Sequence, residues 1–227
     1  MDKMQRLKTS EVTIPQEQLP KYYANTVEEI KVNEKNPRYG DYANSTVHFN
    51  WQDDYEIISK IGRGRYSEVF EALNLLTGER VVVKILKPVK KEKVRREIMC
   101  LQTMRDCEYA IPLYDQVCDP SNVTPSLIFK HVQHQDFRVM YPNLTRSSIK
   151  TLVLKILLGL DYAHSRGIIH RDIKPGNVLM NLRDESAVIA DWGLADFYHP
   201  SKRFNCRVAS RYFKAPELLL GNNYYDY

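Results

Sequence analysis

Residues 170–177 read H-R-D-I-K-P-G-N and place an acid, a lysine and an amide within one short stretch. A second acid follows in the triplet Asp191-Trp192-Gly193. Phosphoryl transfer from ATP needs one carboxylate to orient the attacking hydroxyl, and an amide oxygen and another carboxylate to hold Mg²⁺ against the phosphates. These residue types and their spacing therefore predict phosphoryl-transfer chemistry.

Each of these side chains has an expected role. Asp172 orients the hydroxyl, Asn177 and Asp191 bind the metal, and Lys174 brings a positive charge to the moving phosphoryl group. The alternative is an unrelated loop that carries the pattern by chance, and such a chain should lack the other parts of a nucleotide site.

A candidate phosphate flap precedes these residues. It consists of Ile61, Gly62, Arg63, Gly64, Arg65, Tyr66, Ser67, Glu68 and Val69. Two glycines alone are weak evidence, since many hairpins carry them, and Ser67 stands at the third glycine of G-x-G-x-x-G. A strand-like run rather than a helix follows, which favours a flap over phosphates and argues against a dinucleotide-binding turn. Small residues let backbone N–H groups approach phosphate oxygens.

Lys84 ends the apolar run V-V-V-K. A lysine at the end of a buried strand needs an anion nearby, because its desolvation is otherwise costly. Glu97 lies thirteen residues later in a predicted helix and is the expected partner; together they would hold the α- and β-phosphates. The alternative is a lysine that only extends to solvent.

The elements that must position these groups can be read from periodicity. Strand-like runs occupy residues 55–60, 68–74, 81–86, 111–116 and 126–130, a short hairpin occupies 178–181 and 187–190, and a helix is predicted over 149–166. We expect an α+β fold with an N-terminal arm (1–50), a lobe with a five-stranded antiparallel sheet and one main helix (51–131), and the first part of a mainly helical lobe (132–227). Tyr39, Tyr42, Phe49 and Trp51 should pack on the protein, whereas the first thirty residues should be loose.

Composition narrows the class of protein. The 227 residues carry a net charge of +5, too small to indicate nucleic acid by itself, and the four cysteines show no C-x-x-C spacing. With a polar N-terminus and no long apolar segment, we expect an intracellular protein without a membrane span.

His131 and His134 are interpreted as loop residues rather than metal ligands. The basic run 87–96 fits a solvated helix start, a nucleic-acid patch without aromatic support, or a docking site for acidic peptides.

Several segments together resemble one family. They are G-R-G-R-Y-S-E-V-F-E, V-V-V-K-I-L-K-P-V-K-K, D-W-G and R-V-A-S-R-Y-F-K-A-P-E-L-L, and they are similar to the catalytic alpha subunits of casein kinase II, a family of eukaryotic protein kinases. The resemblance implies a bilobal, constitutively active Ser/Thr kinase of the nucleus and cytoplasm that uses ATP or GTP with Mg²⁺. Val82, Phe129 and Leu179 are assigned to the same nucleotide site.

The resemblance also implies substrates and partners. Serines followed by acidic residues should be attracted by two basic groups, Lys90, Lys91 and Lys93 on one side and Arg207, Arg211 and Lys214 on the other. The N-terminal arm should pack against the activation segment and keep it open without phosphorylation. A dimeric regulatory beta subunit should dock on the outer face of the small sheet, near Ile57, Phe70 and Asp119.

The chain departs from the family at a few positions. Glu92 interrupts the lysine cluster, while Gly40, Gly176 and Ala190 stand where the family has tryptophan, histidine and isoleucine. The family continues beyond the position of Tyr227 through helices that cover the apolar residues at 152–160 and 218–220. We therefore expect a fragment of a longer kinase or a shortened one, with those faces uncovered. The rival hypothesis is a non-catalytic module that binds a regulatory subunit or scaffold.

Overall fold

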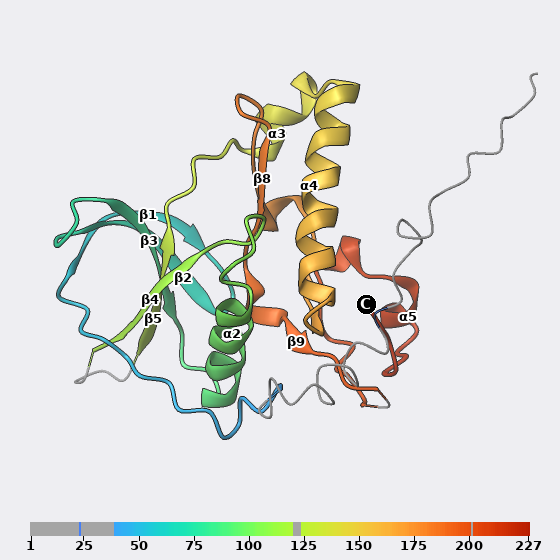
Figure 1. Cartoon of the computed structure of the whole chain (residues 1–227), viewed down its shortest axis with the longest axis horizontal. Coiled ribbons are helices and arrows are strands. Elements are labelled where there is room, and N and C mark those ends of the chain that lie inside the picture. The colour runs from blue at the N-terminus through green and yellow to red at the C-terminus, as the bar shows by residue number, and fades with distance from the viewer. Residues whose placement is uncertain (1–22, 24–38, 120–123, 201) are drawn as a thin grey trace, which may run out of the picture.

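The computed structural model describes residues 23, 39–119, 124–200 and 202–227. Figure 1 shows a twisted sheet with the helix α2 beside it, and a second part built around the long helix α4. The hairpin that contains β8 lies between the sheet and α4 in this view. The expectation that the first thirty residues are loose falls almost wholly outside the described residues.

The sheet has five antiparallel strands in the order β1-β2-β3-β5-β4. Their bounds are β1 Tyr55–Arg63, β2 Ser67–Asn74, β3 Arg80–Leu86, β4 Leu113–Cys118 and β5 Pro125–Lys130. In β3 the side chains of Val81 and Val83 are almost fully buried, as expected for alternate residues of one strand. The predicted five-stranded antiparallel sheet is confirmed, although β4 begins two residues later than the apolar pattern suggested.

The helix α2 (Lys91–Thr103) packs against one face of this sheet. Its buried residues Val94, Ile98 and Leu101 share a core with Leu127 and Phe129 of β5. Glu97 lies on the same buried side of α2, one turn from Val94 and Leu101, so packing of the helix also carries this carboxylate inward. The position of Glu97 is therefore a consequence of the apolar periodicity of the helix.

The second part carries most of the loops that form the site. Its elements are α3 Phe137–Met140, α4 Arg146–His164, β6 Ile168–Ile169, β7 Val178–Asn181, β8 Ser186–Ile189, β9 Asp196–Phe197 and α5 Pro216–Leu219. The side chain of Thr145 caps α4 by accepting the Ser148 N–H at 3.1 Å. β7 and β8 pair with Val178 opposite Ile189. This register brings the residue before β7 and the residues after β8 to the same end of one hairpin.

Apolar residues on one side of α4 and at α5 remain in contact with solvent. Leu152 and Ala163 are buried, whereas Leu154 and Leu157 are each 56 % exposed and Leu220 is 86 % exposed. The expected uncovered faces at 152–160 and 218–220 are present in this structure. Among the described residues, no helix combines the length and the apolar character that crossing a bilayer requires.

Tyr39 joins the chain before the sheet to the second part of the fold. Its hydroxyl lies 2.9 Å from the carbonyl oxygen of Gly167 and 2.8 Å from that of Tyr198, and its ring meets Phe197 edge-on. A side chain at Gly167 would collide with the Tyr39 ring, so glycine is required there for this close approach. Tyr39 is therefore docked against the segment that follows β9.

The expected packing of Phe49 and Trp51 is wrong, because these side chains are 39 % and 66 % exposed. Asn50, between them, pairs with the edge of the sheet: its N–H donates to Gln116 O at 2.9 Å and its carbonyl accepts from Cys118 N at 3.1 Å. This segment is held by its backbone, so its aromatic side chains do not need to be buried.

Candidate active site

Asp172 is almost fully buried, and each of its carboxylate oxygens accepts from more than one donor. Oδ2 lies 2.7 Å from Lys174 Nζ and 2.9 Å from Asn177 Nδ2, while Oδ1 accepts from Ser210 N at 2.9 Å and from Ser210 Oγ at 3.0 Å. This arrangement holds the carboxylate in one orientation. A fixed carboxylate beside a lysine is suited to orienting a hydroxyl and accepting its proton.

Ser210 was not singled out by sequence reasoning. Its hydroxyl also accepts a hydrogen bond from Lys174 Nζ at 2.7 Å, so Asp172, Lys174 and Ser210 form one network. Thirty-eight residues separate Ser210 from Asp172. The residue type and position of Ser210 in the sequence do not reveal this contact with the carboxylate.

His170 links this loop to the β7–β8 hairpin. Its Nδ1 accepts from the backbone N–H of Asp172 at 3.2 Å, and its Nε2 lies 3.1 Å from Ala190 O. Burial lowers the pKa of His170 to about 4, so the imidazole is neutral near pH 7 and Nε2 carries the proton. The ring packs edge-on against the buried Trp192. The tryptophan of D-W-G thus supports the histidine of H-R-D.

Lys84 lies between two carboxylates from distant parts of the chain. Its Nζ is 2.7 Å from Glu97 Oε1 on α2 and 2.8 Å from Asp191 Oδ1 after β8. Burial by itself would lower the pKa of Lys84, but the two carboxylates hold it above its usual range. Burial opposes ionisation of Asp191 as well, yet the charge of Lys84 keeps the pKa of Asp191 below its usual range. Lys84 and Asp191 are therefore both charged at neutral pH.

The backbone around Asp191 is adapted to this close approach. Asp191 adopts a left-handed conformation with φ of 57°, which is uncommon for a residue other than glycine. At Gly193 an added Cβ would lie 3.3 Å from Glu97 Oε2 and 3.4 Å from Asp191 Oδ1. Glycine thus keeps the space between the two carboxylates open.

Asn177 and Asp191 supply oxygen atoms that suit a magnesium ion. Asn177 uses its amide nitrogen to donate to Asp172 O and Oδ2, which turns its amide oxygen away from them. Asp191 is half exposed toward the pocket and uses one oxygen for Lys84. Among the described residues no group of three or more His, Cys, Asp and Glu side chains forms a metal site by itself. Mg²⁺ is commonly held by one or two protein ligands together with substrate phosphates, so the residues fit this ion.

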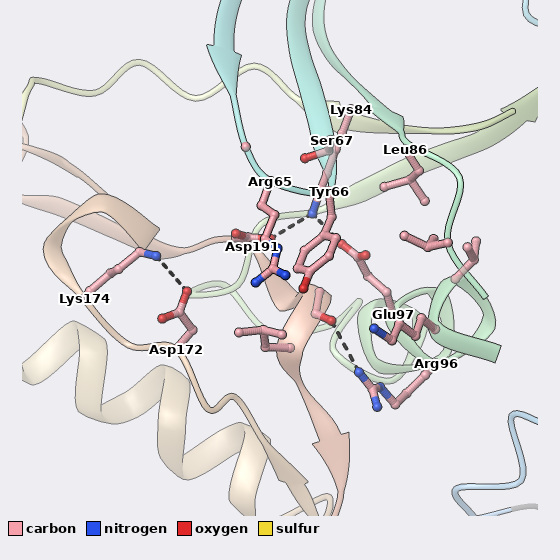
Figure 2. A pocket seen from close by; sticks show the side chains of 16 residues that line it. Arg65, Tyr66, Ser67, Lys84, Leu86, Arg96, Glu97, Asp172, Lys174 and Asp191 are labelled. Atoms are coloured by element: carbon pink, nitrogen blue, oxygen red, sulfur yellow. Dashed lines mark hydrogen bonds and ion pairs between the residues drawn. The ribbon is translucent and has the colours of Figure 1, made fainter. Parts of the chain in front are cut away.

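A pocket of about 280 Å³ lies between the flap tip (residues 64–67), β3, α2 and the loops that carry Asp172 and Asp191. Figure 2 shows Arg65 and Tyr66 pointing down from the flap tip, between Asp172 and Lys174 on one side and Glu97 and Arg96 on the other. The structure thus gathers the lysine, both acids and the flap tip around one cavity.

The other residues predicted for the nucleotide do not line this cavity. Val82 stands opposite Phe129 in the β3–β5 pair, Gly62 stands opposite Val69 in the β1–β2 pair, and Leu179 lies in β7. Ile61 is half exposed, while Arg63 and Glu68 form an ion pair beside it. Their roles in binding a base or ribose stay predictions.

A second cavity, of about 370 Å³, adjoins the first and is strongly basic. We call it the basic cleft. Among the described residues that line it, the cations are Arg65, Lys93, Arg96, Arg171, Lys202, Arg203 and Arg207, and Asp196 is the only acid. Asp196 lies 3.3 Å from Arg96, 3.1 Å from Arg171 and 3.9 Å from Lys202. Nε of Arg96 is buried without a hydrogen-bond partner among the described residues. Positive charge therefore exceeds negative charge, which favours an anionic ligand.

The structure places some of the predicted substrate-binding residues in the basic cleft and others outside it. Lys93 and Arg207 line the basic cleft, whereas Lys90 and Lys91 stand at the start of α2 outside it. Arg211 is exposed, and Lys214 donates to the backbone carbonyls of Cys206 and Val208. Arg96, Arg171, Lys202 and Arg203 were not predicted for this role, because only the fold brings these residues together.

A comparison with protein-family models agrees with this geometry. The protein kinase domain model matches residues 55–227, which covers the whole sheet, α2 and the loops that carry Asp172 and Asp191. The predicted α+β bilobal kinase fold is confirmed by this match and by the five-stranded antiparallel sheet.

Proposed function

The chain belongs to the protein kinase domain family, and on this basis we propose that it is a serine/threonine kinase of the casein kinase II alpha type that phosphorylates acidic sites. Kinases of this family transfer a phosphoryl group from ATP and use a divalent metal ion, for which we propose Mg²⁺. GTP is proposed as a second phosphate donor. The observation that carries the proposal is the basic cleft next to the pocket that contains Asp172 and Lys84.

Each site residue has a separate role in the proposed reaction. Asp172, held by Ser210 and Asn177, orients the hydroxyl of the protein substrate and accepts its proton. Lys174 donates to Asp172 and supplies a positive charge beside the transferring group. Lys84, fixed by Glu97, binds phosphate oxygens under the flap tip. Asn177 and Asp191 would hold a divalent ion, which would supply positive charge against the charge that builds up on the phosphates.

Acidic substrates are favoured by charge complementarity. An aspartate or glutamate that follows the target serine can enter the basic cleft, where seven cationic side chains and one acid, Asp196, are found in the part of the chain that the structure describes. Charge-assisted hydrogen bonds contribute about 1.5–3 kcal/mol each where they are shielded from water. The cleft adjoins the catalytic pocket, so the acidic residues would lie only a short distance from the phosphorylated serine.

A peptide assay tests the proposal. We expect the chain, with Mg-ATP, to phosphorylate a peptide in which serine or threonine precedes aspartate and glutamate. The same peptide with tyrosine as acceptor, or with asparagine and glutamine in place of the acids, should be a poor substrate. Incorporation of labelled phosphate measures each reaction. Equal rates on acidic and neutral peptides would contradict acidic specificity, and no transfer to any peptide would favour the non-catalytic binding module.

Reversal of charge at the start of α2 should weaken substrate binding more than catalysis. The triple substitution Lys90→Glu, Lys91→Glu and Lys93→Glu is expected to raise KM for the acidic peptide about tenfold or more, as loss of one charge-assisted contact implies. kcat should change less than KM, because Lys90 and Lys91 lie outside the pocket that contains Asp172 and only Lys93 reaches it. Initial rates measured over a series of peptide and salt concentrations give KM and kcat. In the triple variant, KM for the acidic peptide should depend less on salt concentration. Lys150→Glu, on the exposed side of α4, is the control; an unchanged KM in the triple variant would contradict the assignment.

We further propose that the kinase acts in the nucleus and cytoplasm and binds a dimeric regulatory beta subunit. The outer side of the sheet supports a docking role, since Ile57 is 46 % exposed and pairs with Ala72 of β2, a strand in which Phe70 lies on the same face as Ala72.

A further inference from the structure

Residues 222–225 hold one side of the basic cleft in place. We call the segment 203–208 the cleft wall, because five of its members line the cleft: Arg203, Phe204, Asn205, Arg207 and Val208. The N–H of Phe204 donates to Asn223 O at 2.8 Å, and Cys206 Sγ lies 3.1 Å from Asn222 O. Residues 222–225 line neither the pocket with Asp172 nor the basic cleft. They therefore support the cleft wall without facing a ligand in either cavity.

Tyr224 and Tyr225 each contact an arginine that lines the basic cleft. Arg203 Nε donates to Tyr224 Oη at 2.8 Å, and its guanidinium lies 5.3 Å from the centroid of the same ring. Arg171 Nη1 donates to Tyr225 Oη at 3.3 Å. Two neighbouring tyrosines thus orient one cation from the cleft wall and one from the H-R-D loop.

The hydroxyl of Tyr225 joins Arg171 to the cleft wall. Besides accepting from Arg171, it donates to Asn205 O at 3.0 Å. The Tyr225 residue is only 8 % exposed, and its ring packs on Phe204 with centroids 5.4 Å apart. Burial raises the pKa of Tyr225 although the charge of Arg171 opposes this, so the hydroxyl keeps its proton at neutral pH and can donate. Loss of this hydroxyl would take one hydrogen-bond partner from a cation and from a carbonyl.

Arg171 is a firm anchor for this bridge. Its side chain is 4 % exposed, its Nε donates to Leu194 O at 2.7 Å, and its Nη2 lies 3.1 Å from Asp196 Oδ2. With Tyr225 at Nη1, each guanidinium nitrogen has a partner on a different part of the chain. The position of the Tyr225 hydroxyl is therefore set by the catalytic loop.

We propose that Tyr225 is a positioning residue for acidic substrates: its hydroxyl fixes the cleft wall against Arg171 and thereby sets the affinity of the basic cleft for a carboxylate. This inference rests on the proposed function and adds to it a residue that the substrate does not touch. The effect reaches the cleft through Asn205, whose Oδ1 accepts from the N–H of Arg207 at 2.8 Å and holds the turn that carries this arginine. A cation that must first be ordered contributes less to affinity, since binding then includes the entropic cost of ordering it.

The test is a binding measurement that needs no turnover. The dissociation constant of a labelled acidic peptide, whose acceptor serine is replaced by alanine, is measured by fluorescence anisotropy on the full chain. Tyr225→Phe keeps the ring and removes the hydroxyl, and we expect it to raise this constant about fivefold, as loss of one hydrogen bond implies. The dissociation constant of a non-hydrolysable ATP analogue with Mg²⁺ should stay unchanged, because Tyr225 does not line the pocket with Asp172. Tyr227→Phe is the matched control, since its hydroxyl is buried without a hydrogen-bond partner among the described residues.

Hydrogen–deuterium exchange separates positioning from a general loss of stability. In Tyr225→Phe the amides of residues 204–207 should exchange faster, while those of β7 and β8 should keep their rates. The positioning role is wrong, and the proposed function stands, if Tyr225→Phe binds the acidic peptide as tightly as Tyr227→Phe does. Faster exchange throughout the chain, or weaker binding of the nucleotide analogue to the same extent, would also contradict it, because a merely structural role predicts both. If the unchanged protein does not bind the acidic peptide, both proposals fail.

Discussion

Replacement of Asp172 by asparagine is expected to lower kcat by about 10²- to 10⁴-fold, the usual contribution of a positioned general base. The substitution keeps the size of the side chain but removes the negative charge. The new amide nitrogen would then face groups that donate hydrogen bonds to the Asp172 carboxylate. These are Lys174 and Asn177 at one oxygen, or Ser210 at the other. Initial rates of phosphate transfer to an acidic serine peptide measure the loss.

Binding of nucleotide should survive this change. Asp172 contacts Lys174 and Ser210 and forms no ion pair with Lys84, which is paired with Glu97 and Asp191. The affinity for Mg-ATP is therefore expected to stay within a few-fold of that of the unchanged protein. Asp184→Asn, in the turn between β7 and β8, is a matched control because its carboxylate accepts from Ser186 N at 3.0 Å and Asp184 is not among the residues that line the pocket with Asp172. A variant at Asp172 that turns over at the normal rate would assign the base to another residue and would contradict the proposed mechanism.

Replacement of Lys84 by methionine should affect both catalysis and stability. Loss of a cation aimed at the phosphates typically lowers kcat by about 10²- to 10³-fold. The change also leaves Glu97, whose side chain is only 7 % exposed, as a buried carboxylate without its cation. Removal of one partner of a buried ion pair costs about 3–5 kcal/mol of folding free energy. Peptide assays and urea unfolding measure the two effects.

A double variant separates these two roles of Lys84. Glu97→Gln together with Lys84→Met removes the unpaired charge, so it should recover most of the lost unfolding free energy. Activity should remain as low as in the single variant, because the cation is still absent. If the double variant regained activity as well, Lys84 would serve only to neutralise Glu97, and its proposed role at the phosphates would be wrong.

Much of the fold could be predicted from local patterns. The strands were recognisable because alternate residues such as Val81 and Val83 must be buried on one face. The proximity of Lys84 and Glu97 was predictable because each sits on an amphipathic element whose buried side is evident from its neighbours. The hairpin that brings Asn177 and Asp191 to one end followed from two short apolar runs and the turn between them.

Other features could not be predicted from residue types, for a common reason. Phe49 and Trp51 were expected to pack on the protein because they are aromatic, but the backbone of Asn50 pairs with β4 and leaves them 39 % and 66 % exposed. Lys214, whose assignment to the substrate stays a prediction, donates to two carbonyl groups of its own segment. In both cases hydrogen bonds of the backbone, which residue types do not reveal, decided where the side chain lies.

Residue types and their spacing were enough to predict phosphoryl-transfer chemistry: an acid, an amide and a lysine at kinase spacing, a glycine flap, and strands and helices that place them. What surrounds these residues became visible in the folded chain alone. The contact of Ser210 with Asp172 spans thirty-eight residues, and the basic cleft collects charges from the flap tip, α2 and the segment after β9. Such contacts depend on how separate elements pack, and no local periodicity encodes the distance between two loops that meet only in the folded chain.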